Sequence, residues 1–182
     1  MPATPRPSPS TPAGAGTVVD SFARRLGEFD GTLHEVASLA QARARARELI
    51  GPSTVARWAD AELDEIVQAD APAAEAEVSL IRADVGVAET GTIGFVHGPG
   101  RSRGAALLPT RQVALLAREH LVPDLATALA RFYGGGARPP ASLVFAAGGS
   151  RTADIEQRMI RGMHGPRDLD VILFGPATAP SA

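Results

Sequence analysis

The stretch LVFAAGGSRTADIEQRMIRGMHGPRDLDVILF, residues 143–174, carries the strongest indication of the fold class. Its apolar run at 143–147 is typical of a buried strand and stops at two glycines. The segment from Thr152 to about Met163 has apolar residues at helical spacing, and a second apolar run follows at 169–174. A strand, a helix and a strand in this order predict two parallel strands joined by a crossover helix.

The same alternation of strand and helix continues toward the N-terminus. We expect strands at residues 32–36, 54–58, 85–96 (interrupted at Gly91) and 112–117 and helices at 39–50, 60–67 and 123–132, whereas 70–77 fits either a loop or the start of a helix. Interleaved strands and helices are typical of α/β proteins. The sequence therefore predicts an α/β fold with a mostly parallel sheet and helices on both faces.

The two ends of the chain differ in composition from its body. Residues 1–16 consist almost entirely of proline, serine, threonine, alanine and glycine, so we expect a disordered tail there. A short frayed tail is expected at 177–182. Residues 31–176 are long enough for one α/β domain with a core of its own.

A separate amphipathic helix is expected at residues 17–30. Val18, Phe22, Leu26 and Phe29 recur at three- or four-residue spacing, which places them on one face of a helix. That face packs either on the core of its own domain, which we favour, or on a partner chain.

The composition excludes several classes of function. Of the 182 residues, 45% are hydrophobic and 21% are charged, and the formal net charge of −2 does not favour nucleic acid as a partner. All 18 basic residues are arginines, which excludes a lysine Schiff base and a phosphate-loop lysine. The absence of cysteine excludes thiol nucleophiles and cysteine-bound iron–sulfur clusters in this chain. No apolar run is long enough to span a membrane and no signal peptide is recognisable, so we expect a cytoplasmic protein.

The first candidate site is the segment AETGTIGFVHGPGRSRGAALLP at 88–109. A carboxylate is followed by two hydroxyl residues around a glycine, and then by a glycine-rich loop with two arginines, a combination that can wrap an anion. The alternative is a β-hairpin with a long polar turn. The candidates are Glu89 as a catalytic carboxylate and Thr90, Gly91, Thr92, Arg101, Ser102 and Arg103 as ligand contacts.

The second candidate site is the glycine turn after residue 147. Backbone N–H groups at the start of the expected helix favour an anion, and ligands of open α/β sheets bind at the carboxyl ends of strands. We therefore expect this turn to face the first segment across one cleft, although Thr152 also suits a simple helix cap. The candidate contacts are Gly148, Gly149, Ser150, Arg151 and Thr152.

His164 at the end of the expected helix is a weak third candidate. It suits a general base, but a helix C-terminal cap is the favoured interpretation. His34, His97 and His120 lie in separate segments without the spacing of metal ligands, so no metal site is predicted.

Five blocks of sequence, taken in order, resemble the LUD-domain family and, within it, the lactate-utilization protein C branch. They are AETGTIGF at 88–95, GRSRGAALLP at 100–109, HLVPDLATAL at 120–129, SRTADIE at 150–156 and GMHGPRDLDVILF at 162–174. The resemblance covers about the C-terminal half of the chain, roughly from Arg82 onward. The chain departs from the family pattern at Gly148-Gly149-Ser150, where members usually have Gly-Pro-Ser, and in passing from Phe29 into the first strand without a long linker.

The resemblance implies a fold like that of the sugar-phosphate isomerase and CoA-transferase superfamily. It also implies a role in oxidising L-lactate to pyruvate together with iron–sulfur partner proteins. A chain without cysteine would then be a non-redox subunit with no cofactor of its own, which binds a small anionic ligand, organises its partners, or does both. The resemblance supplies no established catalytic residue, and it is compatible with a homo-oligomer.

Two other functions remain open on the sequence. The chain could be a stand-alone enzyme or sensor that binds a sugar phosphate or an acyl or CoA compound in a strand-end cleft, with Glu89 as its acid–base or nucleophilic group. It could also be a structural adaptor. Only the first of these requires Glu89 and Arg101 to touch a ligand.

Overall fold

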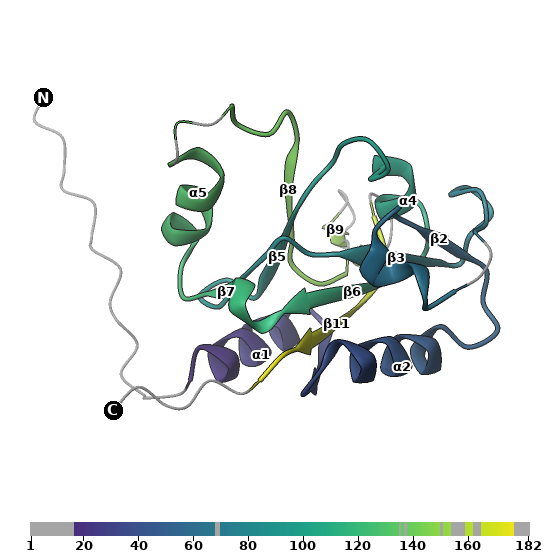
Figure 1. The fold of residues 1–182 in the computed structure, drawn as a ribbon, viewed down its shortest axis with the longest axis horizontal. Coiled ribbons are helices and arrows are strands. Elements are labelled where there is room, and N and C mark those ends of the chain that lie inside the picture. Colours follow the sequence, from purple (N-terminus) through teal and green to yellow (C-terminus); the bar gives the residue numbers. More distant parts are fainter. Residues whose placement is uncertain are drawn as a thin grey trace, which may run out of the picture.

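The computed structural model describes residues 17–67, 70–134, 136, 138–149, 151–153, 159–161 and 165–176 (Figure 1). The tails predicted at 1–16 and 177–182 lie outside this range. Among the residues described, no helix is both long enough and apolar enough to cross a membrane.

The main sheet has five strands, and all of its pairings are parallel. Its order is β1 (Gly31–Val36), β11 (Asp168–Phe174), β6 (Arg111–Ala117), β3 (Val78–Arg82) and β2 (Val55–Arg57). The last strand of the chain therefore lies near the centre of the sheet, between β1 and β6, where it is almost fully buried. The apolar runs are continuous because both faces of these strands are covered.

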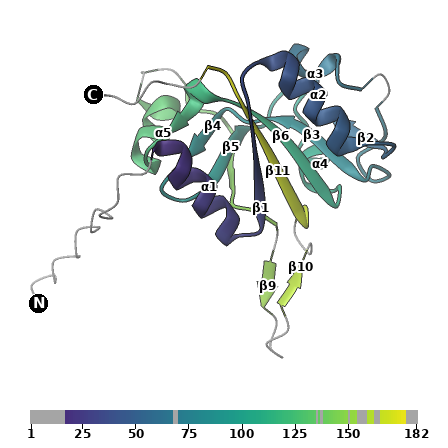
Figure 2. The same cartoon turned by 90° about the horizontal axis from the view of Figure 1, so that it is seen from below.

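Helices cover both faces of this sheet, as the alternation of elements predicts. On one face, α2 (Leu39–Ile50) packs on β11, β6 and β1, and α1 (Val18–Glu28) packs on β1. On the other, α4 (Arg103–Leu107) packs on β3 and β2 (Figures 1 and 2). The fold class is thus confirmed, with α2 beginning and ending where the sequence predicts.

The amphipathic helix α1 packs on its own domain. Phe22 and Leu26 are fully buried, whereas Val18 and Phe29 are each 41% exposed. Thr17 and Asp20 form a reciprocal capping box that begins the helix. The favoured interpretation of its apolar face is confirmed.

A second sheet, which the sequence does not predict, has the order β7, β4, β5, β8. Its strands are β7 (Leu121–Val122), β4 (Val85–Val87), β5 (Thr92–Val96) and β8 (Leu143–Ala146). Both β4–β5 and β5–β8 pair antiparallel, and Gly91 at φ +66° lies in the turn that reverses the chain between β4 and β5. The apolar run at 143–147 is therefore an antiparallel strand rather than part of a parallel unit.

The helix predicted from Thr152 to Met163 is wrong at the residues of this segment that the structure describes, 152–153 and 159–161. Residues Arg151–Ala153 form β9, which pairs antiparallel with β10 (Met159–Arg161), and this small sheet stands apart from the main one in Figure 2. Helical spacing is a weak preference that pairing overrides, and glycines flanking a short segment are typical of a hairpin.

Several further elements refine or differ from the prediction. The helix α3 (Ala61–Asp64) stops three residues before the expected end, and 70–77 contains a loop with a turn. Asp124 caps α5 (Leu125–Tyr133), so Pro123 precedes the cap. The strand β3 has no counterpart among the expected strands, and a 3₁₀ turn, η1 (Arg118–His120), joins β6 to β7.

Candidate functional site

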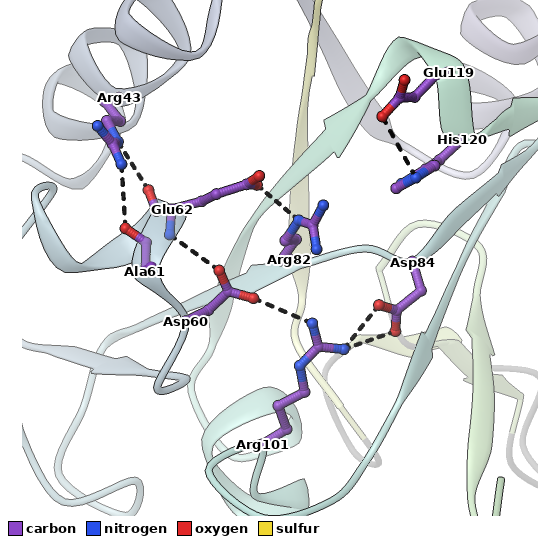
Figure 3. A network of polar contacts seen from close by, with 9 residues as sticks. All are labelled: Arg43, Asp60, Ala61, Glu62, Arg82, Asp84, Arg101, Glu119 and His120. Carbon is purple, nitrogen blue, oxygen red and sulfur yellow. Dashed lines mark hydrogen bonds and ion pairs between the residues drawn. The ribbon is translucent and has the colours of Figure 1, made fainter.

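All five strands of the main sheet end at one edge, which we call the carboxyl edge. Ligands of open α/β sheets bind outside this edge. The segments that follow β2, β3 and β6 bring charged side chains together there (Figure 3). A ligand site of this domain is therefore expected at the carboxyl edge.

Arg101 is held by two carboxylates at the carboxyl edge. One of its terminal nitrogens donates to both oxygens of Asp84, at 2.8 and 2.9 Å, and the other donates to Asp60 at 3.2 Å (Figure 3). Its guanidinium carbon lies 5.2 Å from the ring centroid of the fully buried Trp58. Burial lowers the pKa of Arg101, but hydrogen bonds and charge from Asp84 and Asp60 outweigh it and raise the pKa above its usual value.

The backbone fixes both carboxylates of this cluster. Asp84 also accepts from the backbone N–H of Val96 at 2.8 Å, and Asp60 accepts from that of Glu62 at 3.0 Å. Arg101 itself lies in a tight turn, where its backbone and that of Gly98 bond to each other. The cluster thus joins the ends of β2, β3 and β5 into one rigid unit.

Arg82, the last residue of β3, has guanidinium N–H groups without an acceptor among the described residues. Its Nε lies 2.7 Å from Glu62 Oε2, but the two atoms are not aligned for a hydrogen bond. Its terminal nitrogens donate to no residue in the described part of the chain. The side chain is 23% exposed, so these nitrogens lie at the border of the domain.

His120 is the second group with an unused polar atom. Its Nε2 lies 3.8 Å from Glu119 Oε1, and its buried Nδ1 has no hydrogen-bond partner among the described residues. The residue after it, Leu121, pairs with Gly86, which places His120 beside the start of β4. In Figure 3 the His120 ring and the Arg82 guanidinium point toward one another.

A hollow of about 280 Å³ continues the carboxyl edge over the ends of β6 and β11. Arg118 lies in its wall and donates to Glu35 at 2.9 Å, while its Nε is buried and unpaired within the described chain. Arginine donors at the edge are therefore not confined to Arg101. The other residues of the wall are Ala117, Glu119, Phe174, Gly175 and Pro176.

Of the residues predicted to form a site, only Arg101 belongs to the cluster that it forms with Asp84 and Asp60. Glu89 accepts from the N–H of Leu125 at 2.7 Å, so its carboxylate helps to begin α5, and a catalytic role for it stays a prediction. The remaining residues of the first segment serve the fold locally. Thr90 and Thr92 share a hydrogen bond of 2.8 Å, Gly91 packs against the backbone of α1, Ser102 caps α4, and Arg103 donates to Ser142 at 3.3 Å.

The predicted glycine turn lies at the opposite, amino edge of the main sheet. Gly148 packs against Phe29, just before β1, and Gly149 packs against Arg167, just before β11. The sequence predicts that the turn faces the whole first segment across one cleft, but the turn lies toward the Thr92 end of that segment and away from Arg101. The physical reason is that β8 runs antiparallel to β5, so that Leu143, at its start, pairs with Val96, and the turn at its other end is carried away from Arg101.

The rest of the second segment cannot be placed in a site. Arg151 and Thr152 belong to β9. Ser150 and His164 lie outside the described residues. Anion binding at this turn stays a prediction, as does either role for His164.

Sequence reasoning missed most of the carboxyl-edge residues, namely Trp58, Asp60, Glu62, Arg82, Asp84 and His120. The signal that could have found them is position, because each lies at the end of β2, β3 or β6 or within five residues after it. Because no strand is predicted at 78–82, the sequence does not place Arg82 and Asp84 at the end of a strand. Within the described ranges, no group of three or more His, Asp or Glu side chains is arranged to hold a metal ion.

Comparisons with known proteins agree with this architecture. The LUD domain family model matches residues 39–174. A lactate utilization protein C of Halalkalibacterium halodurans is 32% identical over 112 residues, which are 60% of this chain and 47% of that protein. One from Deinococcus radiodurans is 28% identical over 94% of this chain and 85% of that protein.

Several of the relatives are much longer than the matching region, and this chain spans about half the length of the first of them. In fold, the chain is similar to the crystal structure of a DUF162 family protein from Deinococcus radiodurans, with a TM-score of 0.60 and 21% identity over 90% of this chain and 100% of that one. The match of the domain model over most of the chain decides the family: the chain belongs to the LUD-domain family.

Proposed function

We propose that this chain acts in lactate utilization as the non-redox subunit of an iron–sulfur system that oxidises L-lactate to pyruvate. Its task there is to bind a small carboxylate at the carboxyl edge of the main sheet and to present it to, or sense it for, its partners. The names of the relatives that align with 60% and 94% of the chain support the pathway.

One observation carries the choice of ligand: Arg82 and His120 have polar nitrogens without a hydrogen-bond partner among the described residues, and the two side chains point toward one another (Figure 3). A guanidinium is a planar fork that matches a carboxylate. A partly buried imidazole nitrogen without a partner favours a ligand atom that can pair with it. L-lactate and pyruvate carry a carboxylate next to an oxygen, which suits an arginine and a histidine that point toward one another.

The charge of the edge favours a carboxylate over a phosphate. Asp60, Asp84, Glu62 and Glu119 all lie around this space, and Arg101 is already neutralised by the first two. A dianionic phosphate meets roughly twice the repulsion from these carboxylates that a monoanion meets. The sugar-phosphate alternative is therefore the less favoured one.

The amino-acid composition supports a separation between this subunit and the proteins that transfer electrons. The chain has no cysteine, and its four histidines are in separate segments. Electron transfer then belongs to iron–sulfur partner proteins, and this subunit acts on the substrate or on the assembly.

A panel of ligands tests the proposed function. We expect L-lactate and pyruvate to raise the melting temperature of the full chain, and ribose 5-phosphate and coenzyme A to leave it unchanged. Stabilisation by the phosphorylated compounds alone would contradict the proposal and favour the stand-alone enzyme or sensor.

The pathway is tested separately in the organism that carries the gene. We expect a deletion strain to lose growth on L-lactate and to regain it with the intact gene. Purification of the tagged chain should retain cysteine-rich partners with the visible absorption of iron–sulfur clusters. A deletion strain that grows normally on L-lactate would contradict the proposed role.

A further inference from the structure

The glycine turn at the amino edge borders a cavity of about 480 Å³. Its walls include the side chains of Phe29, Leu107, Val144, Phe145 and Leu169, and none of the described residues that line it carries a charge. The volume falls within the range of roughly 300–1,000 Å³ that is usual for small-molecule pockets. An unpaired charge is costly in such surroundings, so a suitable ligand is neutral.

Among the lining residues that the structure describes, Gln112 has the one polar side chain. It is 2% exposed, and its Nε2 donates to the carbonyl of Ala106 at 2.8 Å. This bond fixes the orientation of the amide, because a carbonyl only accepts. Oε1 therefore stays free as an acceptor, and no residue in the described part of the chain donates to it.

A neighbouring strand position has unused polar capacity as well. Ser79 in β3 is the register partner of Gln112 in β6, and it is fully buried with no hydrogen-bond partner for its Oγ among the residues described. Buried polar groups are rarely left unpaired in folded proteins. Ser79 is not among the residues that line the cavity, so Gln112 Oε1 is the side-chain acceptor that the described wall offers to a ligand.

The wall of the cavity beside the turn is closely packed. A Cβ atom at Gly148 or Gly149 would collide with the carbonyl oxygen of Phe29 or Arg167, respectively. The turn is thus pressed against the segments that lead into β1 and β11. Glycine is required here for close approach of the backbone, which gives these positions a role that does not depend on an anion.

We propose that this cavity binds a neutral, mainly apolar small molecule with a single hydroxyl or N–H group, which donates to Gln112 Oε1. The site is separate from the carboxyl edge and shares none of its residues. Phe29, Leu107, Val144 and Leu169 hold the apolar body of the ligand, and Gln112 selects for its donor.

A pair of probes that differ in one donor tests this site on the full chain. Indole has an N–H group, whereas benzofuran has the same shape with an ether oxygen in its place. With methyl-labelled leucine and valine, we expect indole to shift the NMR signals of Leu107, Val144 and Leu169 and to leave those of Val55 and Leu63 unchanged. Indole should bind roughly fivefold more tightly than benzofuran, as one neutral hydrogen bond implies.

Two matched substitutions complete the test. Ala146→Trp, in the cavity wall, should abolish the indole shifts, and Ala130→Trp, at an exposed position of α5, should not. Should Ala146→Trp fail to fold, nuclear Overhauser contacts between indole and the Leu107 and Val144 methyl groups in the unaltered chain decide the location. The proposal is overturned if saturating indole shifts none of the three methyl signals, or if indole and benzofuran bind equally well.

Discussion

Arg101 and Asp84 are 17 positions apart in the chain, and one guanidinium nitrogen of Arg101 donates to both carboxylate oxygens of Asp84, at 2.8 and 2.9 Å. The pair joins the loop after β5 to the segment between β3 and β4. Both side chains are about one-fifth exposed, so the interaction is screened less than a surface ion pair. This contact holds the two segments together at the carboxyl edge.

Loss of the Asp84 charge should destabilise the domain. Asp84→Asn leaves Arg101 with Asp60 as its remaining carboxylate partner, and we expect the free energy of unfolding in urea to fall by about 2 kcal/mol. Glu28→Gln is the control, because its ion pairs with Arg24 and Arg25 are on the exposed face of α1 and should leave the free energy of unfolding nearly unchanged. Equal losses in the two variants would show that the Arg101 cluster has no special weight.

A second, partly buried charge network lies between the main sheet and α2. Asp170 accepts from Nε and NH2 of Arg111, at 3.0 and 2.9 Å, and pairs with His34 Nε2 at 2.8 Å. Asp170→Asn should lower the free energy of unfolding by roughly 3 kcal/mol, because Arg111 loses its carboxylate partner. The exposed Glu48→Gln, which breaks only the pair with Arg45, should cost less than about 0.5 kcal/mol. A cost for Asp170→Asn as small as that of the control would contradict this account.

Two glycines with positive φ provide a test of packing against α1. A Cβ at Gly91 (φ +66°) would collide with the backbone of Leu26 and Arg25, whereas nothing lies within 4 Å of a Cβ at Gly51 (φ +57°). We expect Gly91→Ala to cost at least about 3 kcal/mol and Gly51→Ala about 1 kcal/mol, since the second carries only backbone strain. Thermal unfolding of both variants measures the difference, and similar losses would mean that α1 does not press on this turn.

The cap of α5 predicts a dependence of stability on pH. The backbone N–H of Thr127 donates to Asp124 and lowers the pKa of that carboxyl below its ordinary value of 3.8. A lowered pKa in the folded state stabilises the fold above pH 3.8, and this contribution is lost as the pH falls through the folded value. Asp124→Ser keeps a cap but cannot titrate, so the stability advantage of the unaltered chain over this variant should shrink between pH 5 and pH 2. A difference that stays constant over that range would contradict the assignment.

The sequence predicts the main sheet better than the site. Long apolar runs in β6 and β11 and the periodic face of α2 are local signals, and they locate these elements closely. The second sheet depends on the reversal at Gly91 and on pairing between β5 and β8, which are about fifty residues apart in the chain, so no local pattern predicts it.

The site was harder to predict because its contacts are distant in sequence. Arg101 was identified from its glycine-rich loop, but its partner Asp60 is 41 positions away, and Arg82 ends a strand that was not expected. At 152–163 the local pattern gives a wrong prediction, since the apolar spacing indicates a helix where β9 and β10 pair instead. Ion pairing between distant residues determines the surroundings of Arg101, and strand pairing determines the structure at 151–153 and 159–161.

Binding of L-lactate to the carboxyl edge is the central claim, and isothermal titration calorimetry on three forms of the full chain tests it most directly. The unaltered chain should bind L-lactate, and Arg82→Met should weaken binding by roughly tenfold or more, because charged hydrogen bonds to the carboxylate are lost. Arg24→Met, on the exposed face of α1, should bind as the unaltered chain does. Equal affinity of the Arg82→Met and unaltered forms, or no binding to any form, would contradict the account.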